Sequence, residues 1–400
     1  MTLALDEFRR RTKEFLADNA APRSGPPVEW TEDSLVAECR RFHGALSDAG
    51  LGGITYPVEF GGLGLDKGYV EVFNQEISKY QAPLVPTAIS HGMCLPVIND
   101  FGTPEQKARH QARIIRCDEI WCQMFSEPGA GSDVASLAMR AVRDGDEWVL
   151  NGQKVWTSGA QYCDYGLCVA RTDPAQPKHR GLSMFIVDLS LPGVDIRPLR
   201  QINGSSHFNE VYLTDVRVGH GCLVGDEGNG WNVAVAMLMY ERVAIGAGGS
   251  GAMSQSMSST KLINEARRRG RHRDPVVRDA LADLYIRERI QKFVGMRIRQ
   301  AAASGKAPGP EGSIAKLNTA LLSRRAADVA MELAGPSGQA WDGAEEGADE
   351  WASAVISAPG MAIAGGTNEV QRNIIGERVL GLPKEPDPFK GQPWEEVPRS

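Results

Sequence analysis

The chain has 400 residues, which is long for one hydrophobic core and favours two or three domains. Hydrophobic residues make up 42% of it and charged residues 24%, as in ordinary globular proteins. The net charge of −6 gives no electrostatic reason to expect nucleic acid or an anionic membrane as the main partner. No apolar run approaches the ~18 residues of a membrane span, and acidic residues in the first segment argue against a transit peptide. We therefore expect a mature cytoplasmic protein.

The cysteines favour neither a disulfide framework nor a metal site. Seven is an odd number, and the residues are scattered through a long chain. Cys117 and Cys122 have the same four-residue gap as Cys163 and Cys168, which is one pattern that could indicate a metal. Zinc pairs usually have two-residue gaps, however, and these cysteines lie in apolar, strand-like sequence. We predict free thiols and no metal.

The N-terminal third has apolar residues at helical spacing. One stripe consists of Leu5, Phe8, Phe15 and Leu16, and a second of Leu35, Cys39, Phe42, His43 and Leu46. The second stripe stops before Gly50, which is a common helix terminator. "YPVEFGGLGLD" interrupts the pattern as a loop, and "YVEVFNQEIS" resumes it. Residues 1–120 are predicted to form a helical domain.

From about Trp121 the apolar spacing changes to that of strands. "LSMFIVDL" and "FNEVYLTDVRV" are predicted to alternate as half-buried strands, with prolines and glycines between strands as turns. "EWVLNGQKVW" is interpreted as two short strands joined at Asn151-Gly152, a strong hairpin signal. Residues 121–226 are predicted to be an all-β domain.

Helices return after "GDEGNGW" and continue to the Pro-rich tail, so residues 227–400 are predicted to be a helical bundle. The segment 277–300 is amphipathic, and its apolar positions include Leu281, Leu284, Tyr285, Phe293 and Val294. The segment 315–335 is expected to end as a helix at Gly335. The prolines of "LPKEPDPFKGQPWEEVP" argue against a further helix. The fold class is thus α+β, in the order helices, β domain, helical bundle.

Three motifs contain residue types that hold anions or planar rings. "SEPGAGSD" (residues 126–133) offers close backbone approach and the Ser132 hydroxyl, as an anion cradle or equally as a tight turn. It is not the dinucleotide fingerprint, because Val134 stands where the last glycine would be. "KVWTSGAQ" places Trp156 beside Ser158, which suits a stacked heteroaromatic ring or a core tryptophan. "GGTNEVQRN" is a phosphate or ribose contact or a capped interhelical turn.

In this order and arrangement, the chain resembles the acyl-CoA dehydrogenase family of flavoproteins, with a middle β-barrel domain between helical domains. The resemblance rests on "SEPGAGSD", "NGQKVWTSG", "FNEVYLTDVRV", "VGDEGNGW" and "GGTNEVQRNIIGERVLGLP". It implies that FAD is the cofactor, with Ser132 at its pyrophosphate and Trp156 on its ring. It also implies cofactor contacts for Phe125, Ser126, Gly131, Ser158, Thr367 and Glu369, and contacts to a neighbouring subunit's FAD for Glu332 and Gly335.

The family converts an acyl-CoA to its trans-2-enoyl thioester, and electron-transfer flavoprotein accepts the electrons. A carboxylate takes the α proton while the β carbon passes a hydride to the flavin. Many relatives carry this base before a Gly-Thr pair, where the present chain has Gly365, expected instead to contact substrate. A minority place it in a Glu-Arg pair on a C-terminal-domain helix, which makes Glu241 the candidate base and Arg242 a substrate contact. The alternative is a solvated helix surface, but the flanking run is apolar, where a free charge is costly.

The resemblance also implies a role in lipid metabolism such as β-oxidation, and a homotetramer or heterotetramer (a dimer of dimers). Many relatives have an Arg followed three residues later by Phe-Gly, which this chain lacks. Its basic run from Arg267 to Arg273 either meets FAD or CoA phosphates or forms a solvated interhelical loop.

The substrate is expected to be branched or bulky. Glycines at 246, 248, 249 and 251 interrupt an expected helix after Glu241, either to make room for a large acyl group or to let helices pack closely. Two alternative functions remain open: an oxygen-using oxidase or monooxygenase of the same fold, and a noncatalytic subunit that completes a partner's FAD site.

Overall fold

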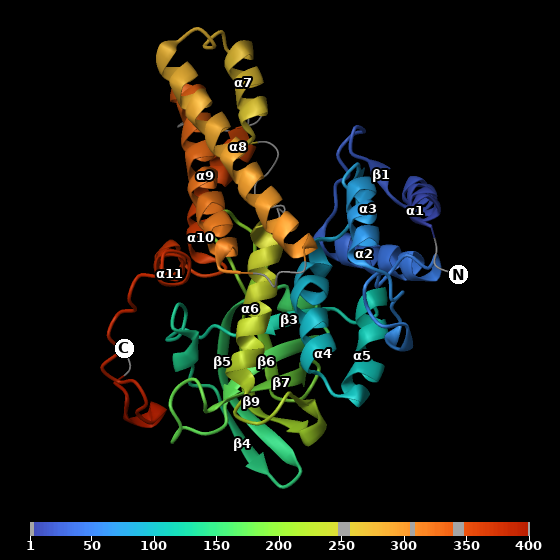
Figure 1. Ribbon diagram of the computed structural model, residues 1–400, viewed down its shortest axis with the longest axis vertical. Helices are drawn as coiled ribbons and strands as arrows, with labels where there is room; N and C mark the ends of the chain where they lie inside the picture. Colours follow the sequence, from blue (N-terminus) through green and yellow to red (C-terminus); the bar gives the residue numbers. More distant parts are fainter. Residues whose placement is uncertain (1–3, 247–256, 305–308, 339–347, 399–400) are drawn as a thin grey trace. The chain divides into compact units, whose positions relative to one another are not determined.

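The computed structural model describes residues 4–246, 257–304, 309–338 and 348–398 (Figure 1). The chain forms two compact units. The first comprises Met1–Leu199, Ser206–Met237 and Phe389–Ser400, and the second comprises Arg200–Ser205 and Leu238–Pro388. Each unit is described by itself below.

The N-terminal region is helical, and both predicted stripes contribute side chains to its core. The helices are α1 (Leu5–Asn19), α2 (Glu32–Asp48), α3 (Lys67–Ile77), α4 (Leu95–Phe101) and α5 (Pro104–Arg116). Phe8 and Phe42 are fully buried, whereas Leu5, at the start of α1, is 46% exposed. The Thr31 hydroxyl caps α2 by accepting a hydrogen bond from the Ser34 amide at 3.2 Å. The helical interpretation of this region is confirmed.

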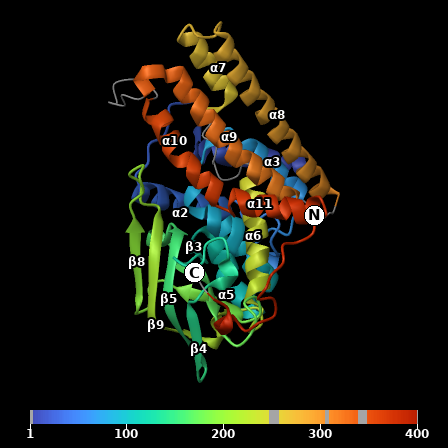
Figure 2. The ribbon, with the colours of Figure 1, turned by 90° about the vertical axis from the view of Figure 1, so that its left-hand side faces the viewer.

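The rest of the first unit is built on a mixed sheet. Among the described residues, its eight strands are β3 (Trp121–Met124), β4 (Arg140–Asp144), β5 (Glu147–Ser158), β6 (Tyr165–Arg171), β7 (Leu182–Asp188), β8 (Val194–Leu199), β9 (Phe208–Gly219) and β10 (Leu223–Val224). Their order is β10-β7-β6-β4-β5-β9-β8, and β3 pairs parallel with β6. Figure 2 shows β4, β5, β9 and β8 side by side in that order. A separate two-stranded sheet joins β1 (Ala21–Pro22) to β2 (Tyr80–Gln81).

The hairpin predicted at Asn151-Gly152 is wrong. β5 runs without a break through both residues, and its pairing with β9 shifts register between Leu150 and Gly152. Gly152 has φ +151°, and an added Cβ would lie 2.9 Å from Met139 Cα, so glycine is needed here for a bulge and a close approach. The turn that joins β4 to β5 comes earlier, at Gly145 with φ +64°.

The expected burial pattern holds for β9 and fails for β7. Side chains alternate along much of β9, whereas β7 is buried from Leu182 to Val187. The start of α6 (Gly230–Gly246) covers β7, since a Cβ added at Gly230 would lie 2.5 Å from Ser183 Cα. A strand covered on both faces does not alternate.

The second unit is helical. It contains the end of α6 together with α7 (Ser259–Arg268), α8 (Pro275–Ala303), α9 (Glu311–Ala334), α10 (Ala348–Ile363) and α11 (Asn368–Ile374). Helices α8, α9 and α10 run side by side in both views (Figures 1 and 2). Leu281 and Leu284 are buried as expected, but Tyr285 and Phe293 are 47% and 53% exposed, on the outer side of α8. α9 ends at Gly335, with φ +61°, as predicted.

The Pro-rich tail returns to the first unit. It has one 3₁₀ turn at Trp394–Glu396 and no α-helix among its described residues. The Trp394 amide donates to the Gln176 carbonyl at 2.9 Å, and the Glu395 amide donates to the Pro174 carbonyl at 3.1 Å. The last residues therefore belong to the unit that contains the sheet.

Candidate active site

The "SEPGAGSD" loop follows β3 and presents an open face. Glu127 and Ala130 exchange backbone hydrogen bonds of 3.2 and 3.0 Å, which makes a tight turn. A Cβ added at Gly129 or Gly131 would meet no atom within 4 Å, and Ser132 is exposed. Contacts among the described residues therefore do not require these glycines. Turn and cradle are compatible here, because the turn leaves space for a ligand beside its backbone.

A buried ion pair fixes this loop to β5. Lys154 is 0% exposed, and its ammonium donates to the Glu127 carboxylate at 2.8 Å and to the Phe125 carbonyl at 2.9 Å. The same carboxylate accepts from the amides of Ala138 at 2.6 Å and Met139 at 3.0 Å. Because both charges are paired and hydrogen-bonded, the pair can hold the loop rigidly. Sequence reasoning missed this pair, although both residues lie inside the first two motifs.

Trp156 projects from β5 in a strained conformation. Its φ is +60°, and the pairing of β5 with β9 is irregular between Lys154 and Thr157. The indole is 58% exposed and meets Phe208 edge-on, with ring centroids 5.8 Å apart. The core-tryptophan alternative is therefore wrong. An exposed aromatic held in the left-handed region is a feature of ligand sites, where strain is retained for function.

The first two motifs are neighbours in the first unit. The Val155 amide donates to the Ser126 carbonyl at 2.9 Å, which joins the loop to the strand that carries Trp156. Phe125 is buried and Ser158 half-buried at the end of β5. The structure thus joins the segment of Phe125 and Ser126 to the strand that carries Trp156 and Ser158, and Gly131 and Ser132 follow in the same loop.

Arg171 fastens the far end of the loop. Its guanidinium is buried and donates to the carbonyls of Ala135 at 2.7 Å, Leu137 at 3.2 Å and Lys178 at 2.8 Å. The Trp394 ring lies over it, with its centroid 4.4 Å from the guanidinium carbon. The Trp394 indole also donates to the Ser136 carbonyl at 3.3 Å. The sequence signal for this contact was the single tryptophan of the Pro-rich tail.

In the second unit, the Gly365-Gly366-Thr367 turn joins α10 to α11. Both glycines have left-handed backbones, with φ of +65° and +88°. Thr367 caps α11 by accepting from the Val370 amide at 3.2 Å. The capped-turn interpretation is thus correct as structure, and it leaves Glu369 exposed in the first turn of the helix.

Two interior side chains hold this turn by its carbonyls. Gln371 donates to the Gly365 carbonyl at 2.8 Å, and the Lys316 ammonium donates to the Gly366 carbonyl at 2.6 Å. Lys316 and Gln371 are both fully buried. Burial lowers the pKa of Lys316, while the carboxylates of Glu241 and Glu369 act in the opposite direction.

Glu241 lies on α6 and is half-buried. Arg242 is the next residue of that helix, but its side chain lies outside the described part of the chain. Gly246 is the last residue of α6, and Gly248, Gly249 and Gly251 lie outside the described residues. The structure therefore places the candidate base, and leaves its neighbours along the chain as predictions.

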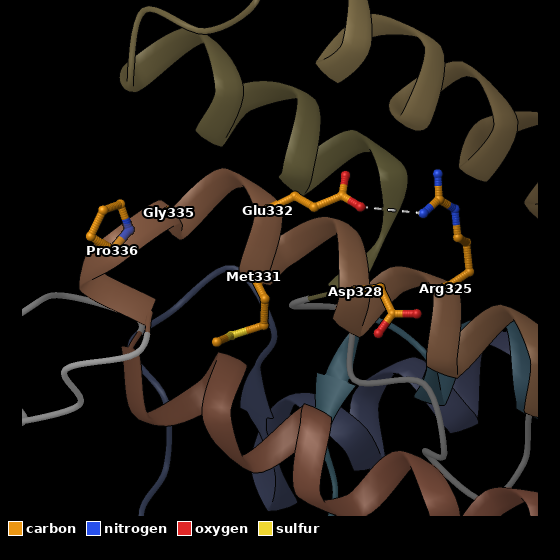
Figure 3. A pocket seen from close by; sticks show the side chains of 6 residues that line it. All are labelled: Arg325, Asp328, Met331, Glu332, Gly335 and Pro336. Carbon is orange, nitrogen blue, oxygen red and sulfur yellow. Dashed lines mark ion pairs between the residues drawn. The ribbon is translucent and has the colours of Figure 1, made fainter.

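Glu332 and Gly335 line a cavity of about 680 Å³ at the end of α9 (Figure 3). Its other lining residues are Arg325, Asp328, Met331 and Pro336. The Arg325 guanidinium forms an ion pair with the Glu332 carboxylate at 3.6 Å, which is the dashed line in Figure 3. The Arg271 guanidinium, from the basic run, donates to the Glu332 carbonyl. The two candidates therefore share one site, which is separate from the Gly365 turn in the sequence.

The basic run is mostly engaged within its own unit. Arg268 and Arg269 each form a 2.6 Å ion pair with Glu265, and the Arg269 guanidinium lies 5.0 Å from the Trp351 ring centroid. Arg271 pairs with Asp274 at 3.3 Å. Each cysteine is free, and the described residues contain no group of acidic, histidine or cysteine side chains arranged for a metal. In the same part of the chain, every helix is too short or too polar to cross a bilayer.

Three family models together match most of the chain. They are the N-terminal domain of acyl-CoA dehydrogenase over residues 2–118, the middle domain over 122–216 and the C-terminal domain over 228–380. The chain belongs to the acyl-CoA dehydrogenase family. It is accordingly an enzyme of a flavoprotein family, with the expected order of helical, β and helical parts.

Mycobacterial acyl-CoA dehydrogenases are among its similar relatives. The chain is 37% identical over 391 residues to acyl-CoA dehydrogenase IpdE1 of Mycobacterium tuberculosis, covering 95% of this chain and 98% of that protein. Among solved structures, the Tcur3481-Tcur3483 steroid ACAD matches with a TM-score of 0.77 and 26% identity, covering 96% of this chain and 100% of that one. The ChsE4-ChsE5 complex from M. tuberculosis matches with a TM-score of 0.74 and 29% identity, over 96% and 99% of the two chains.

Proposed function

We propose that this acyl-CoA dehydrogenase binds FAD and oxidises a branched or bulky acyl-CoA to its trans-2-enoyl thioester in the cytoplasm, with electron-transfer flavoprotein as acceptor. The observation that carries the proposal is the exposed, strained Trp156 beside the open glycine cradle. Packing among the described residues explains neither feature. Both are expected where a dinucleotide cofactor with a planar ring system binds.

The residues of the cradle fit FAD. Open backbone at Gly129 and Gly131 and the exposed Ser132 hydroxyl suit its pyrophosphate, while the exposed indole of Trp156 suits its ring. Ser158 would donate a hydrogen bond to the polar edge of that ring. When bound, FAD supplies the acceptor for a hydride from the substrate's β carbon. Thr367 and Glu369, and Glu332 and Gly335 from a neighbouring subunit, are proposed as further contacts.

Glu241 is proposed to take the α proton of the thioester. Gly365 has no side chain for this step, and Glu241 is a half-buried carboxylate in the apolar sequence of α6. Partial burial limits the access of water to the carboxylate, which would otherwise be solvated and less able to take the proton. Gly365 and Arg242 are proposed to contact the substrate, through backbone and guanidinium respectively.

The test of this role is Glu241→Gln, which is nearly isosteric and cannot accept a proton. The variant should fold and keep its flavin spectrum, but substrate should reduce its flavin more than ~10²-fold slower in anaerobic stopped flow. Glu385→Gln, an exposed change of the same chemistry in the tail, is the matched control and should keep the wild-type rate. A rate for Glu241→Gln within about tenfold of wild type would assign the base elsewhere.

Two observations support a branched or bulky substrate: the names of similar proteins and the proposed location of the base. A similar solved structure is described as a steroid ACAD, and another similar protein is a 2-methylacyl-CoA dehydrogenase of Solanum tuberosum, at 27% identity over 391 residues. The test is kcat/KM for butyryl-CoA against branched-chain and steroid side-chain acyl-CoA thioesters. A preference for butyryl-CoA would contradict a wide pocket and leave the dehydrogenase assignment unaffected.

We also propose a tetramer, with identical or paired subunits. One of the similar solved structures is a complex of ChsE4 with ChsE5. Large apolar side chains on the outer side of α8, among them Ile290 and Phe293, are at least 50% exposed in the single chain, as expected for a surface covered on assembly. Light scattering and flavin content of the chain expressed alone would test this. A flavin-free monomer that gains FAD only on co-expression with a second dehydrogenase chain would favour the paired form.

A further inference from the structure

Asn209 is a buried amide near the start of β9, opposite the segment that carries Trp156. It is 0% exposed and pairs with Thr157 in the register of the two strands, directly after the irregularity that follows Lys154. Its Nδ2 atom donates to the Thr157 carbonyl at 3.0 Å and to the Gln161 Oε1 atom at 2.5 Å. An amide is costly to bury, so its place beside the strained tryptophan calls for a physical reason.

A chain of hydrogen bonds fixes which way the Asn209 amide points. The Glu32 carboxylate, at the start of α2, accepts from Gln161 Nε2 at 2.9 Å. Because an ionised carboxylate only accepts, Gln161 turns its amino group to Glu32 and its carbonyl to Asn209. Asn209 must then present its own amino group, whose two N–H donors go to Gln161 and to the Thr157 carbonyl. A flipped Asn209 would place its carbonyl oxygen against two others.

This arrangement leaves two buried polar atoms unpaired. Among the described residues, Asn209 Oδ1 and the Thr157 hydroxyl have no hydrogen-bond partner, although the two side chains are 0% and 1% exposed. Unpaired polar atoms are costly to bury, and leucine and valine, which have similar shapes, would avoid the cost. Stability alone therefore does not account for Asn209, and the backbone carbonyl that it holds provides another reason.

That carbonyl lies in the segment that carries two of the proposed ring contacts. At one end of the segment, the Val155 amide donates to the "SEPGAGSD" loop at 2.9 Å, and at the other end Asn209 holds the Thr157 carbonyl. Trp156 lies between these two hydrogen bonds, with φ +60°. The Thr157 carbonyl belongs to the peptide group that leads into Ser158, so its direction also orients Ser158. A left-handed backbone at a bulky residue persists only where its surroundings hold it.

We propose that Asn209 is a positioning residue for the flavin ring. It fixes the Thr157–Ser158 peptide group, and thereby holds the Trp156 indole and the Ser158 hydroxyl in the places where the ring binds. Asn209 acts through these two residues and makes no contact of its own with cofactor or substrate. The part that concerns FAD rests on the proposed function.

The first test is the affinity of Asn209→Leu for FAD, since leucine keeps the volume and removes both donors. In a titration of the cofactor-free full-length protein, its Kd should be about fivefold higher than that of wild type. Asn74→Leu, an exposed change of the same chemistry on α3, should leave the Kd unchanged. Gln161→Leu removes the link to Glu32 and keeps the Thr157 contact, so it should raise the Kd about twofold, and it replaces Asn209→Leu if that variant does not fold.

A double-mutant cycle separates positioning from a general loss of structure. In a protein that carries Trp156→Ala and Ser158→Ala, adding Asn209→Leu should change the Kd by less than about twofold, because the groups through which Asn209 acts are gone. A loss of affinity of the same size in both backgrounds would overturn the proposal, since Asn209 would then act on the fold as a whole.

A second measurement needs no cofactor. In protein labelled with fluorotryptophan, the fluorine NMR line of Trp156 is assigned by its absence in Trp156→Phe, and the line of Trp148 is assigned in the same way. In Asn209→Leu the Trp156 line should broaden or divide, because the indole then adopts several conformations. The line of Trp148, which is 2% exposed in the core, should stay as in wild type. An unchanged Trp156 line would overturn the positioning role.

The two proposals fail in different ways. If Trp156→Ala and Ser158→Ala leave the Kd for FAD unchanged, the proposed cofactor contacts are wrong, even where Asn209→Leu alters the Trp156 line. If those two changes weaken binding but Asn209→Leu alters neither the Kd nor the Trp156 line, the cofactor site is retained and Asn209 is not its positioning residue.

Discussion

Trp156 combines two features that are unfavourable in the chain alone. A left-handed backbone costs a bulky residue on the order of 1–2 kcal/mol, and its indole leaves 58% of its surface in water. Trp148, on the same strand, is 2% exposed and packs against Phe185 with ring centroids 5.5 Å apart. One tryptophan of β5 therefore stabilises the fold, and the other is available to a ligand.

This contrast predicts opposite effects for the same substitution. Trp156→Gly should change the unfolding free energy of the cofactor-free protein by no more than about 1 kcal/mol, because relief of strain offsets the lost contacts. It should weaken FAD binding about tenfold through the lost stacking. Trp148→Gly should lower the unfolding free energy by about 3–5 kcal/mol. Urea unfolding and flavin titration measure both; equal destabilisation by the two changes would refute the strain argument.

The Lys154–Glu127 pair has its own test. Lys154→Met leaves the Glu127 carboxylate buried without its cation, so the unfolding free energy should fall by about 3–5 kcal/mol. The double change Lys154→Met with Glu127→Gln should recover part of this loss, because no uncompensated charge remains. Chemical denaturation of the wild type, of Lys154→Met, of Glu127→Gln and of the double variant measures the coupling. A double variant less stable than the single one would mean that the pair does not act through charge.

At the level of elements, local patterns predicted the helices and failed where a distant element decided the outcome. The stripes of α1 and α2 and the end of α9 at Gly335 follow from spacing and local backbone preference. Asn151-Gly152 is a turn signal that pairing with β9 overrides, and the full burial of β7 depends on α6. The exposed apolar residues of α8 belong to the predicted apolar pattern but face outward. The spacing of apolar residues predicts which side of a helix is apolar, but it does not predict what covers that side.

Short sequence motifs predicted the candidate ligand contacts of the site but not the side chains that hold them in place. The loop, Trp156 and the glycine turn were identified as candidates from residue types, but their alternatives could not be separated without exposure and backbone angles. Lys154, Arg171 and Lys316 act from inside the protein through backbone carbonyls. Such contacts join residues far apart in the chain and leave no local pattern.

The C-terminal tail is expected to strengthen the binding of FAD. Trp394→Ala removes the ring over the Arg171 guanidinium and the hydrogen bond to Ser136. Loss of a partly buried cation–π contact, about 1–2 kcal/mol, should loosen the end of the cradle loop and raise the Kd for FAD several-fold. Fluorescence titration of the cofactor-free protein with FAD measures it. Glu396→Ala, an exposed neighbour in the tail, is the control; the same Kd in both variants would show that the tail does not support the loop.

At the scale of the whole molecule, stability should depend on pH through a buried histidine pair. Burial, and then the neighbouring His91, lower the pKa of His43 well below 6.5, and burial also lowers the pKa of His91. The centroids of the two imidazole rings are 4.5 Å apart. Both are thus neutral in the folded state where the unfolded chain binds protons. Below about pH 6.5 the unfolded chain binds protons at these two histidines and the folded protein does not. The unfolding free energy is therefore highest above about pH 6.5 and falls as the pH drops below it.

The corresponding prediction concerns His43→Gln. In wild type, the unfolding free energy should fall by up to about 1.4 kcal/mol per histidine for each pH unit below about 6.5. The variant should show a shallower decrease between about pH 6.5 and 5.5, and lower stability at neutral pH. His220→Gln, an exposed histidine, should retain the wild-type slope. Denaturation curves across pH give the slopes, and parallel wild-type and His43→Gln curves would exclude the pair as the cause.

The return of the tail to the sheet also sets an order of events in synthesis. Gln176 and Arg171 leave the ribosome more than two hundred residues before Trp394, the residue that covers them. The β domain can form its strands while the chain grows, but the far end of its cradle loop stays uncovered until Trp394 has been added and has left the ribosome. The affinity for FAD that we propose for this loop should therefore rise only after Trp394 is in place.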